Sequence, residues 1–356
     1  MQPGIVKAVT GVVHVDAARG RAQVDAIASF IDDVASHGTT DGPIHGEVFK
    51  FGNPSVEGAL LRAMEGGTPV SIVADSGVGV PRLHDLAAAG ATVVKYGASA
   101  HRDAAAGADL CMHAKLWSRG DHALLPTASA ADAGSRQLNL NLRFSGDSAR
   151  AARSASAAAM TNERSDVRDA LERAREHGVL FNDPTIPVRH LDDAMGALVD
   201  HADHRLELVI KEFTVDAWAE RLAAAQARGV DVDVTTRMMT RSVRRILEDA
   251  GVHETTVPFS RTPGLRELLG QRLHFNAVFA DVPTAAELRA GASIDGAHAV
   301  VGTRYLWEPT KPGERLAREN GVALAGTNAL DARRAVAAHV GLSHLGVLRA
   351  SMRANA

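Results

Sequence analysis

Apolar runs alternate along the first part of the chain with segments whose apolar residues recur at helical spacing. Residues 46–51, 69–75 and 91–97 are short and apolar, as strands are, whereas residues 54–67 and 80–90 have the periodicity of helices. The predicted order is therefore strand, helix, strand, helix, strand. Alternation of this kind favours a largely parallel sheet that is covered by helices.

The pattern changes after residue 97. Residues 112–117 and 122–127 predict a hairpin, and residues 136–144 predict a further strand. An alanine-rich and charge-rich stretch follows, which we interpret as two helices joined by a loop near residues 161–165. These helices are expected to connect the first half of the chain to the second.

The same order of elements returns from residue 205. The segments predict strand, helix, strand, helix and strand in turn: residues 205–213, 214–229, 230–237, 242–251 and 252–259. Such recurrence indicates an internal repeat.

Three landmarks support the repeat, because they recur at nearly one offset. Phe51 and Phe213 are 162 positions apart, as are Gly67 and Gly229, and residues 113 and 274 are both histidines 161 positions apart. We expect two domains, with residues 1–180 holding the first repeat, an N-terminal helix and the connector, and residues 181–356 holding the second repeat.

Composition narrows the class of protein. The formal net charge of −3 gives no strong signal for nucleic-acid binding. The single cysteine, Cys111, excludes an intrachain disulfide framework and a cysteine-rich zinc site.

The sequence begins without the pattern of a secretory signal and contains no apolar window that could span a membrane, so we expect a cytoplasmic protein. No phosphate-binding glycine loop or clean metal-ligand set is present, and no cofactor or metal is predicted.

Candidate chemistry lies in residues 110–121, LCMHAKLWSRGD. Side chains two apart on a strand point to the same face, so an imidazole and an ammonium, His113 and Lys115, would together hold an anion. The matching stretch of the second half, LHFNAVFAD, carries His274 and Asn276. Because both copies have the pattern, we predict that the two histidines serve one site.

The two stretches resemble the signature of the phospholipase D superfamily, which is His-x-Lys-x4-Asp, present twice and followed each time by a Gly-Ser-x-Asn-like turn. In the first copy Asp121 stands one residue late, and in the second Asp281 is correctly spaced but Asn276 replaces the lysine. The resemblance covers about residues 44 to 150 and 205 to 345. It implies an α/β fold of two tandem phospholipase D-like repeats, with mostly parallel sheets flanked by helices and a central site on a pseudo-twofold axis.

The resemblance also implies the roles of the two histidines. One attacks phosphorus to form a phosphohistidine, and the other protonates the leaving group and then activates water or an alcohol. We assign the first role to His113 and the second to His274. The carboxylates are expected to orient the rings, and the lysine and asparagine to bind phosphoryl oxygens. The remaining members of this predicted catalytic set are Lys115, Asn276, Asp281 and Asp121.

Further residues are expected to contact substrate because they occupy the two turns, share the strand face of His113, or lie near the ends of the first strands, where open α/β sheets bind ligands. These residues are Ser135, Gln137, Gly302, Thr303, Tyr305, Trp117, Lys211 and Lys50. An ordinary turn, core or surface role is the alternative for each of them.

The sequence thus predicts a phosphodiester hydrolase or phosphoryl-linked group transferase that acts on a small-molecule or lipid-headgroup substrate. Since both motifs lie in one chain, a monomer can complete the site. Two alternatives stay open. The neutral Asn276 and the displaced Asp121 also fit another group transfer, acyl or aminoacyl, in specialised metabolism, and they fit a non-catalytic anion-binding module.

Overall fold

The computed structural model describes residues 7–11, 13–19, 21–38, 41–75, 81–96, 110–127, 129–130, 137–161, 164–186, 188–256, 272–273, 276–303 and 316–340. Within these residues no helix combines the length and the apolar character needed to cross a membrane.

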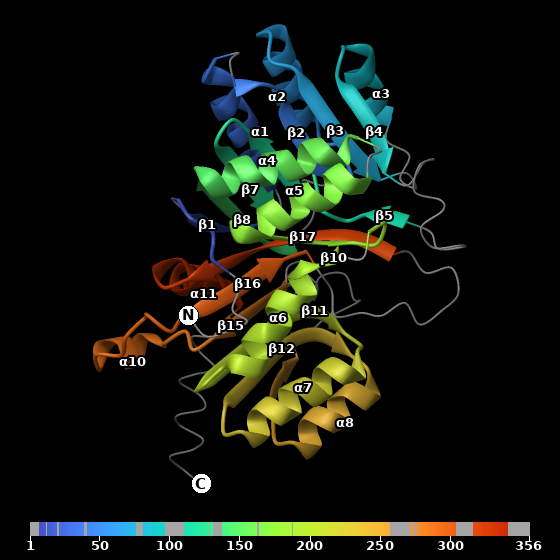
Figure 1. Cartoon of the computed structure of the whole chain (residues 1–356). Coiled ribbons are helices and arrows are strands. Elements are labelled where there is room, and N and C mark those ends of the chain that lie inside the picture. Colours follow the sequence, from blue (N-terminus) through green and yellow to red (C-terminus); the bar gives the residue numbers. More distant parts are fainter. Residues whose placement is uncertain are drawn as a thin grey trace, which may run out of the picture.

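The first half of the chain begins with a strand and a helix and continues with the predicted β-α-β-α-β order and four more strands (Figure 1). Its elements are β1 (His14–Arg19), α1 (Arg21–Ser36), β2 (Ile44–Val48), α2 (Pro54–Glu65), β3 (Val70–Asp75), α3 (Pro81–Ala88), β4 (Thr92–Tyr96), β5 (Leu110–Met112), β6 (Leu116–Arg119), β7 (His122–Pro126), β8 (Gln137–Ser145) and α4 (Asp147–Ala159).

Helix α5 (Arg164–Glu176) leads into the second half, whose described elements have the same order with an added short strand, β10, and an added short helix, α10. Its elements are β9 (Val179–Asp183), β10 (Val188–Arg189), α6 (His190–His201), β11 (Arg205–Phe213), α7 (Asp216–Ala227), β12 (Asp231–Met239), α8 (Arg241–Asp249), β13 (His253–Thr256), β14 (Arg272–Leu273), β15 (Asn276–Ala280), α10 (Ala285–Arg289), β16 (His298–Gly302), β17 (Leu316–Ala325) and α11 (Thr327–Val340).

Each half forms one sheet, and the strand orders correspond. The first sheet runs β1-β8-β7-β6-β2-β3-β4, and the second runs β10-β9-β17-β16-β15-β11-β12-β13. The registers correspond as well, because Gly46 pairs with Trp117 in the first sheet and Leu208 pairs with Val278, at the equivalent positions, in the second. The predicted duplication is confirmed.

The sheets are mixed, and the expectation of mostly parallel strands holds for only one side of each. Strands β2, β3 and β4 are parallel, as are β11, β12 and β13, because helices connect them. The strands on the other side are joined largely by hairpins and run antiparallel, as in β6-β7-β8 and β15-β16-β17. These antiparallel strands make each sheet mixed.

The two halves exchange short strands. Strand β5 of the first half pairs in parallel with β17 of the second, and β14 of the second half pairs in parallel with β8 of the first. Consequently His113, which follows β5, is held against the sheet of the second half.

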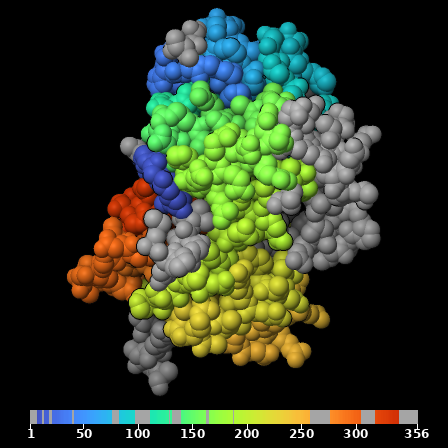
Figure 2. All heavy atoms as spheres, viewed as in Figure 1, coloured from blue at the N-terminus to red at the C-terminus, as the bar shows by residue number. Residues whose placement is uncertain are grey.

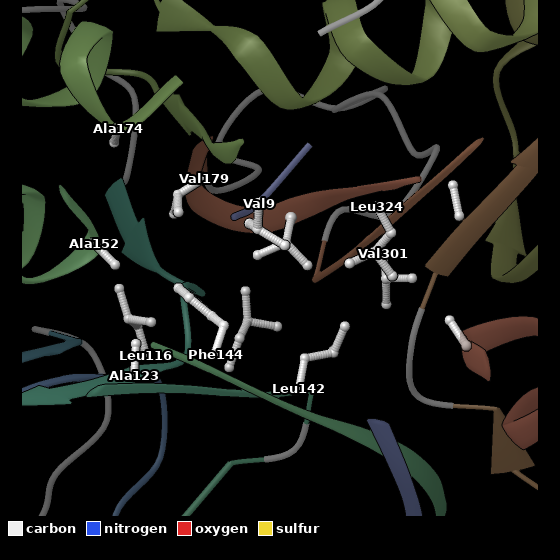
Figure 3. Packing of buried hydrophobic residues seen from close by; sticks show 14 of the residues in the cluster. Val9, Leu116, Ala123, Leu142, Phe144, Ala152, Ala174, Val179, Val301 and Leu324 are labelled. Carbon is white, nitrogen blue, oxygen red and sulfur yellow. The ribbon is translucent and has the colours of Figure 1, made fainter. Parts of the chain in front are cut away.

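A shared apolar core joins the two sheets. Leu116, Phe144 and Leu142 of the first sheet lie opposite Val301 and Leu324 of the second (Figure 3). Each sheet also packs its other face against its own helices, which follows from the alternation of side chains along a strand. In the space-filling view the helices α4 and α5, in green, lie between the blue first half and the yellow second half (Figure 2). The site described next is formed where the exchanged strand β5 meets β17.

Candidate active site

His113 and Lys115 lie in the three-residue segment between β5 and β6, not on a strand as predicted. The segment is still fixed, because the His113 N–H donates to the carbonyl of Arg318 at 2.9 Å and extends the pairing of β5 with β17. The side-chain amide of Asn320 holds the backbone of Lys115 at both its N–H and its carbonyl, each at 3.0 Å. The two predicted residues are therefore positioned by the opposite half of the chain.

The ring of His113 is buried against Glu319 of β17. Nδ1 of His113 lies 2.8 Å from Oε2 of Glu319, and the hydroxyl of Thr303 donates to the same oxygen at 2.5 Å. Both the ring and the carboxylate are nearly inaccessible to solvent. Because an ionised carboxylate can only accept, Nδ1 carries the hydrogen and Nε2 presents its lone pair. The edge of the ring also packs on Phe49, with the ring centroids 5.1 Å apart.

Lys115 directs its ammonium to the other side of this ring. Its Nζ lies 3.2 Å from Nε2 of His113 and donates to the carbonyl of His113 at 2.8 Å. The side chain is buried, with 2% of its surface exposed. A basic nitrogen and a cation thus meet at one point, where an anion could be bound.

Burial governs the ionisation of this pair. It lowers the pKa of His113, which Glu319 raises and Lys115 lowers further. Burial also lowers the pKa of Lys115, to about 8, although Glu319 opposes the shift. At neutral pH the imidazole is therefore neutral, and most of the lysine is still charged.

The predicted residues of the second half that the structure describes are Asn276, Gly302, Thr303, Asp281 and Lys211. Asn276 begins β15 and is 2% exposed, and its Oδ1 accepts the backbone N–H of Lys211 at 3.1 Å. Gly302 pairs with Asn276, and it lies so close to β17 that a Cβ would meet the Asn320 carbonyl at 2.7 Å. Four predicted residues, or their side chains, lie outside the described residues: His274, Ser135, Tyr305 and the side chain of Gln137.

The structure describes the contacts of both motif aspartates, and only those of Asp121 can be compared with a described ring, His113. Asp121 lies in an exposed turn, where its carboxylate contacts His122 and Arg150. Asp281 follows the far end of β15, and its carboxylate accepts the backbone N–H groups of residues 203, 204 and 205. The structure contradicts the predicted orienting role of Asp121 toward His113, because Glu319 and not Asp121 contacts the ring. Strand β6, which follows Lys115, carries Asp121 away from His113.

Two other predicted contacts, Trp117 and Lys50, also have defined places. Trp117 packs in the outer core of the first sheet, against Gly46 and not toward His113, because the strand begins only at Leu116. The Nζ of Lys50 lies 5.4 Å from the ring centroid of Phe49, and the Nζ of Lys115 lies 5.9 Å from the same point. Lys50 thus shares the aromatic neighbour of the site.

Sequence reasoning missed Glu319, Asn320 and Phe49. The only signal was the polar run Arg-Glu-Asn inside an otherwise apolar strand, residues 318–320.

A buried ionic network lies directly behind Glu319 and Asn320. Arg318 is fully buried, donates to both oxygens of Glu47 at 3.1 and 3.0 Å, and donates to Asp183 at 2.5 Å. Among the described residues no group of three or more His, Cys, Asp or Glu side chains is arranged to hold a metal ion.

Two solved structures are similar over most of this chain. Polyphosphate kinase from Porphyromonas gingivalis matches 88% of the chain with a TM-score of 0.59 and 13% sequence identity, and phosphatidylserine synthase from Haemophilus influenzae Rd KW20 matches 94% with a TM-score of 0.58 and 9% identity. Both belong to the phospholipase D superfamily. The chain has the phospholipase D fold.

The coverage of the two phospholipase D-fold neighbours differs. This chain spans 44% of the polyphosphate kinase and 88% of the phosphatidylserine synthase. No family model and no curated protein matches the sequence. At these sequence identities the similarity establishes the fold alone. The chemistry of this protein depends on the residues around His113 and Lys115.

Proposed function

We propose that the protein cleaves a phosphodiester, or transfers a phosphoryl-linked group, through a covalent intermediate on His113. The observation that carries the proposal is the buried contact of His113 with Glu319 on one side of the ring and with Lys115 on the other. The two halves of the chain supply these groups jointly, so a single chain suffices for this half of the site.

The first step forms a bond between Nε2 of His113 and phosphorus. The bond from phosphorus to the leaving alcohol breaks, and the oxygen of the leaving group takes a proton from a general acid. Lys115 stabilises the negative non-bridging oxygens, and Glu319 stabilises the positive charge that the ring acquires. For the general acid we propose His274, on the strength of the motif, since this residue lies outside the described residues.

The second step regenerates the enzyme. The same general acid, now a base, takes the proton of water or of an acceptor alcohol, whose oxygen bonds to phosphorus as the phosphorus–nitrogen bond breaks. Water gives hydrolysis, and an alcohol gives transfer. The names of the two fold neighbours, a kinase of polyphosphate and a synthase of phosphatidylserine, support phosphoryl chemistry with a small-molecule or lipid-headgroup substrate.

The test uses bis(4-nitrophenyl) phosphate as a generic phosphodiester. Wild-type protein should release 4-nitrophenol and gain the mass of a 4-nitrophenylphosphoryl group in intact mass spectra recorded without acid, and His113→Ala should do neither. His201→Ala is the matched control, because His201 is an exposed histidine at the end of α6. Absence of both turnover and adduct with wild-type protein, for this compound and for lipid phosphodiesters, would contradict the proposal.

A second candidate is another group transfer, acyl or aminoacyl, with the histidines as acid and base. The uncharged Asn276 at the place of the second motif lysine favours it, because an amide donates hydrogen bonds without neutralising a phosphoryl charge. Activity on an acyl substrate that His113→Ala abolishes, without any phosphorylated intermediate, would select this candidate over the first.

A further inference from the structure

The duplicated fold allows the two halves of the site to be compared position by position. Strand β2 pairs with β6 as β11 pairs with β15, so Lys115 corresponds to Asn276 and Phe49 corresponds to Lys211. The first half therefore has an aromatic residue directly after β2 and a lysine in the motif. In the second half the lysine stands on the first strand and the neutral residue stands in the motif.

The relocated lysine lies beside the asparagine. The backbone N–H of Lys211 donates to Oδ1 of Asn276 at 3.1 Å, which turns the amide nitrogen of that asparagine to the opposite side. This Nδ2 is buried and has no hydrogen-bond partner among the described residues. A buried donor without a partner is costly to a fold, and a bound ligand oxygen would satisfy it.

The surroundings of Lys211 fit a binding role for its ammonium. The side chain is 17% exposed, and its Nζ lies 3.8 Å from Oε1 of Glu212, whereas Arg237 contacts that oxygen at 2.5 Å. Burial lowers the pKa of Lys211, as do Arg237 and Lys50, and Glu212 raises it. Lys211 in turn lowers the pKa of both His113 and Lys115, so its charge is within electrostatic reach of the catalytic pair.

We propose that Lys211 replaces the missing second motif lysine, so that its ammonium and the amide of Asn276 bind the oxyanion from the side opposite Lys115. This inference relies on the proposed function only for the identity of the anion as a phosphoryl group. The inference explains how the second motif can have Asn276 in place of lysine, because Lys211 on the neighbouring strand β11 supplies the positive charge of the site instead.

The test measures binding of inorganic phosphate by calorimetry at fixed low ionic strength. Lys211→Gln should weaken phosphate binding tenfold or more, whereas Lys211→Arg, which keeps the charge, should stay within about threefold of wild type. The double variant Lys211→Gln/Asn276→Lys returns the cation to the motif and should recover most of the affinity. Lys95→Gln is the control, since Lys95 is an exposed strand lysine on β4.

Equal phosphate affinity in wild type and Lys211→Gln would overturn the inference, as would equal losses in the Gln and Arg variants. If the double variant melts well below wild type, the contrast between Lys211→Gln and Lys211→Arg decides alone. The outcome is separable from the proposed function. Phosphate binding that depends on Lys211 without turnover of any phosphodiester contradicts only the function, and turnover that Lys211→Gln leaves intact contradicts only this inference.

Discussion

Replacing Glu319 by glutamine tests the central contact of the site. Glutamine keeps the size of the side chain and one acceptor oxygen for Nδ1 of His113, but it removes the negative charge. When Nε2 bonds to phosphorus the ring becomes positively charged, so the carboxylate stabilises the intermediate more than it stabilises the free enzyme. Glu319→Gln should therefore slow adduct formation and leave the fold intact.

The size of the effect follows from the geometry. A hydrogen bond to a charged group contributes about 1.5–3 kcal/mol, against about 1 kcal/mol for a neutral one. Two unit charges about 4 Å apart interact by about 4 kcal/mol at an effective dielectric constant of about 20. We therefore expect a loss of about 2–4 kcal/mol, or roughly 30- to 1000-fold in the rate of adduct formation.

The assay is a single-turnover measurement of 4-nitrophenol release over a range of pH. Because Glu319 raises the pKa of His113, the acidic limb of the rate profile should move to lower pH in Glu319→Gln. Glu172→Gln is the matched control, since Glu172 lies 3.1 Å from Nε2 of another buried histidine, His190, on the connector side of the fold. An unchanged rate in Glu319→Gln, or an equal loss in Glu172→Gln, would refute the reasoning.

Three further outcomes are expected. The rate should fall above about pH 8, where Lys115 loses its charge, and Lys115→Arg should remove this alkaline limb in a profile of kcat/KM against pH. Burial lowers the pKa of His45 to about 4, so on acidification the unfolded chain takes up a proton near pH 6.5, before the folded chain does. Thermal melts should therefore show that the protein loses stability between about pH 6.5 and 4. The His45→Gln variant should lose less stability over the same range. Arg318→Met leaves the buried Glu47 unpaired and should cost about 3–5 kcal/mol in urea unfolding, whereas Arg221→Met, which breaks an exposed pair, should cost less than about 1 kcal/mol.

The element order was readable from local pattern because helices and strands have different apolar periods. The strand at residues 205–213 was predicted with the bounds that β11 has, and the equal offsets of the landmarks identified the duplication. The hairpin region was predicted less well. A three-residue strand, β5, is too short for periodicity to separate it from the following segment, and it exists because β17 pairs with it.

Of the predicted motif residues, the structure brings His113 and Lys115 together, whereas their partners Glu319 and Asn320 were missed. His113 and Lys115 are two residues apart, so their sequence spacing was enough to place them together. Glu319 is separated from His113 by 206 residues, and no local pattern specifies which carboxylate will meet the ring. Asp121 was the nearer choice in sequence, and the structure places it in an exposed turn.

The sequence by itself determined the repeated order of elements and the kinds of side chain available to the site, because these follow from local periodicity and composition. Only the tertiary structure decided which groups touch His113, because the exchange of β5 and β14 between the two sheets joins segments far apart in the chain. Burial in that junction then set the charge states of the imidazole and the lysine, since desolvation exists only once the two halves have packed together.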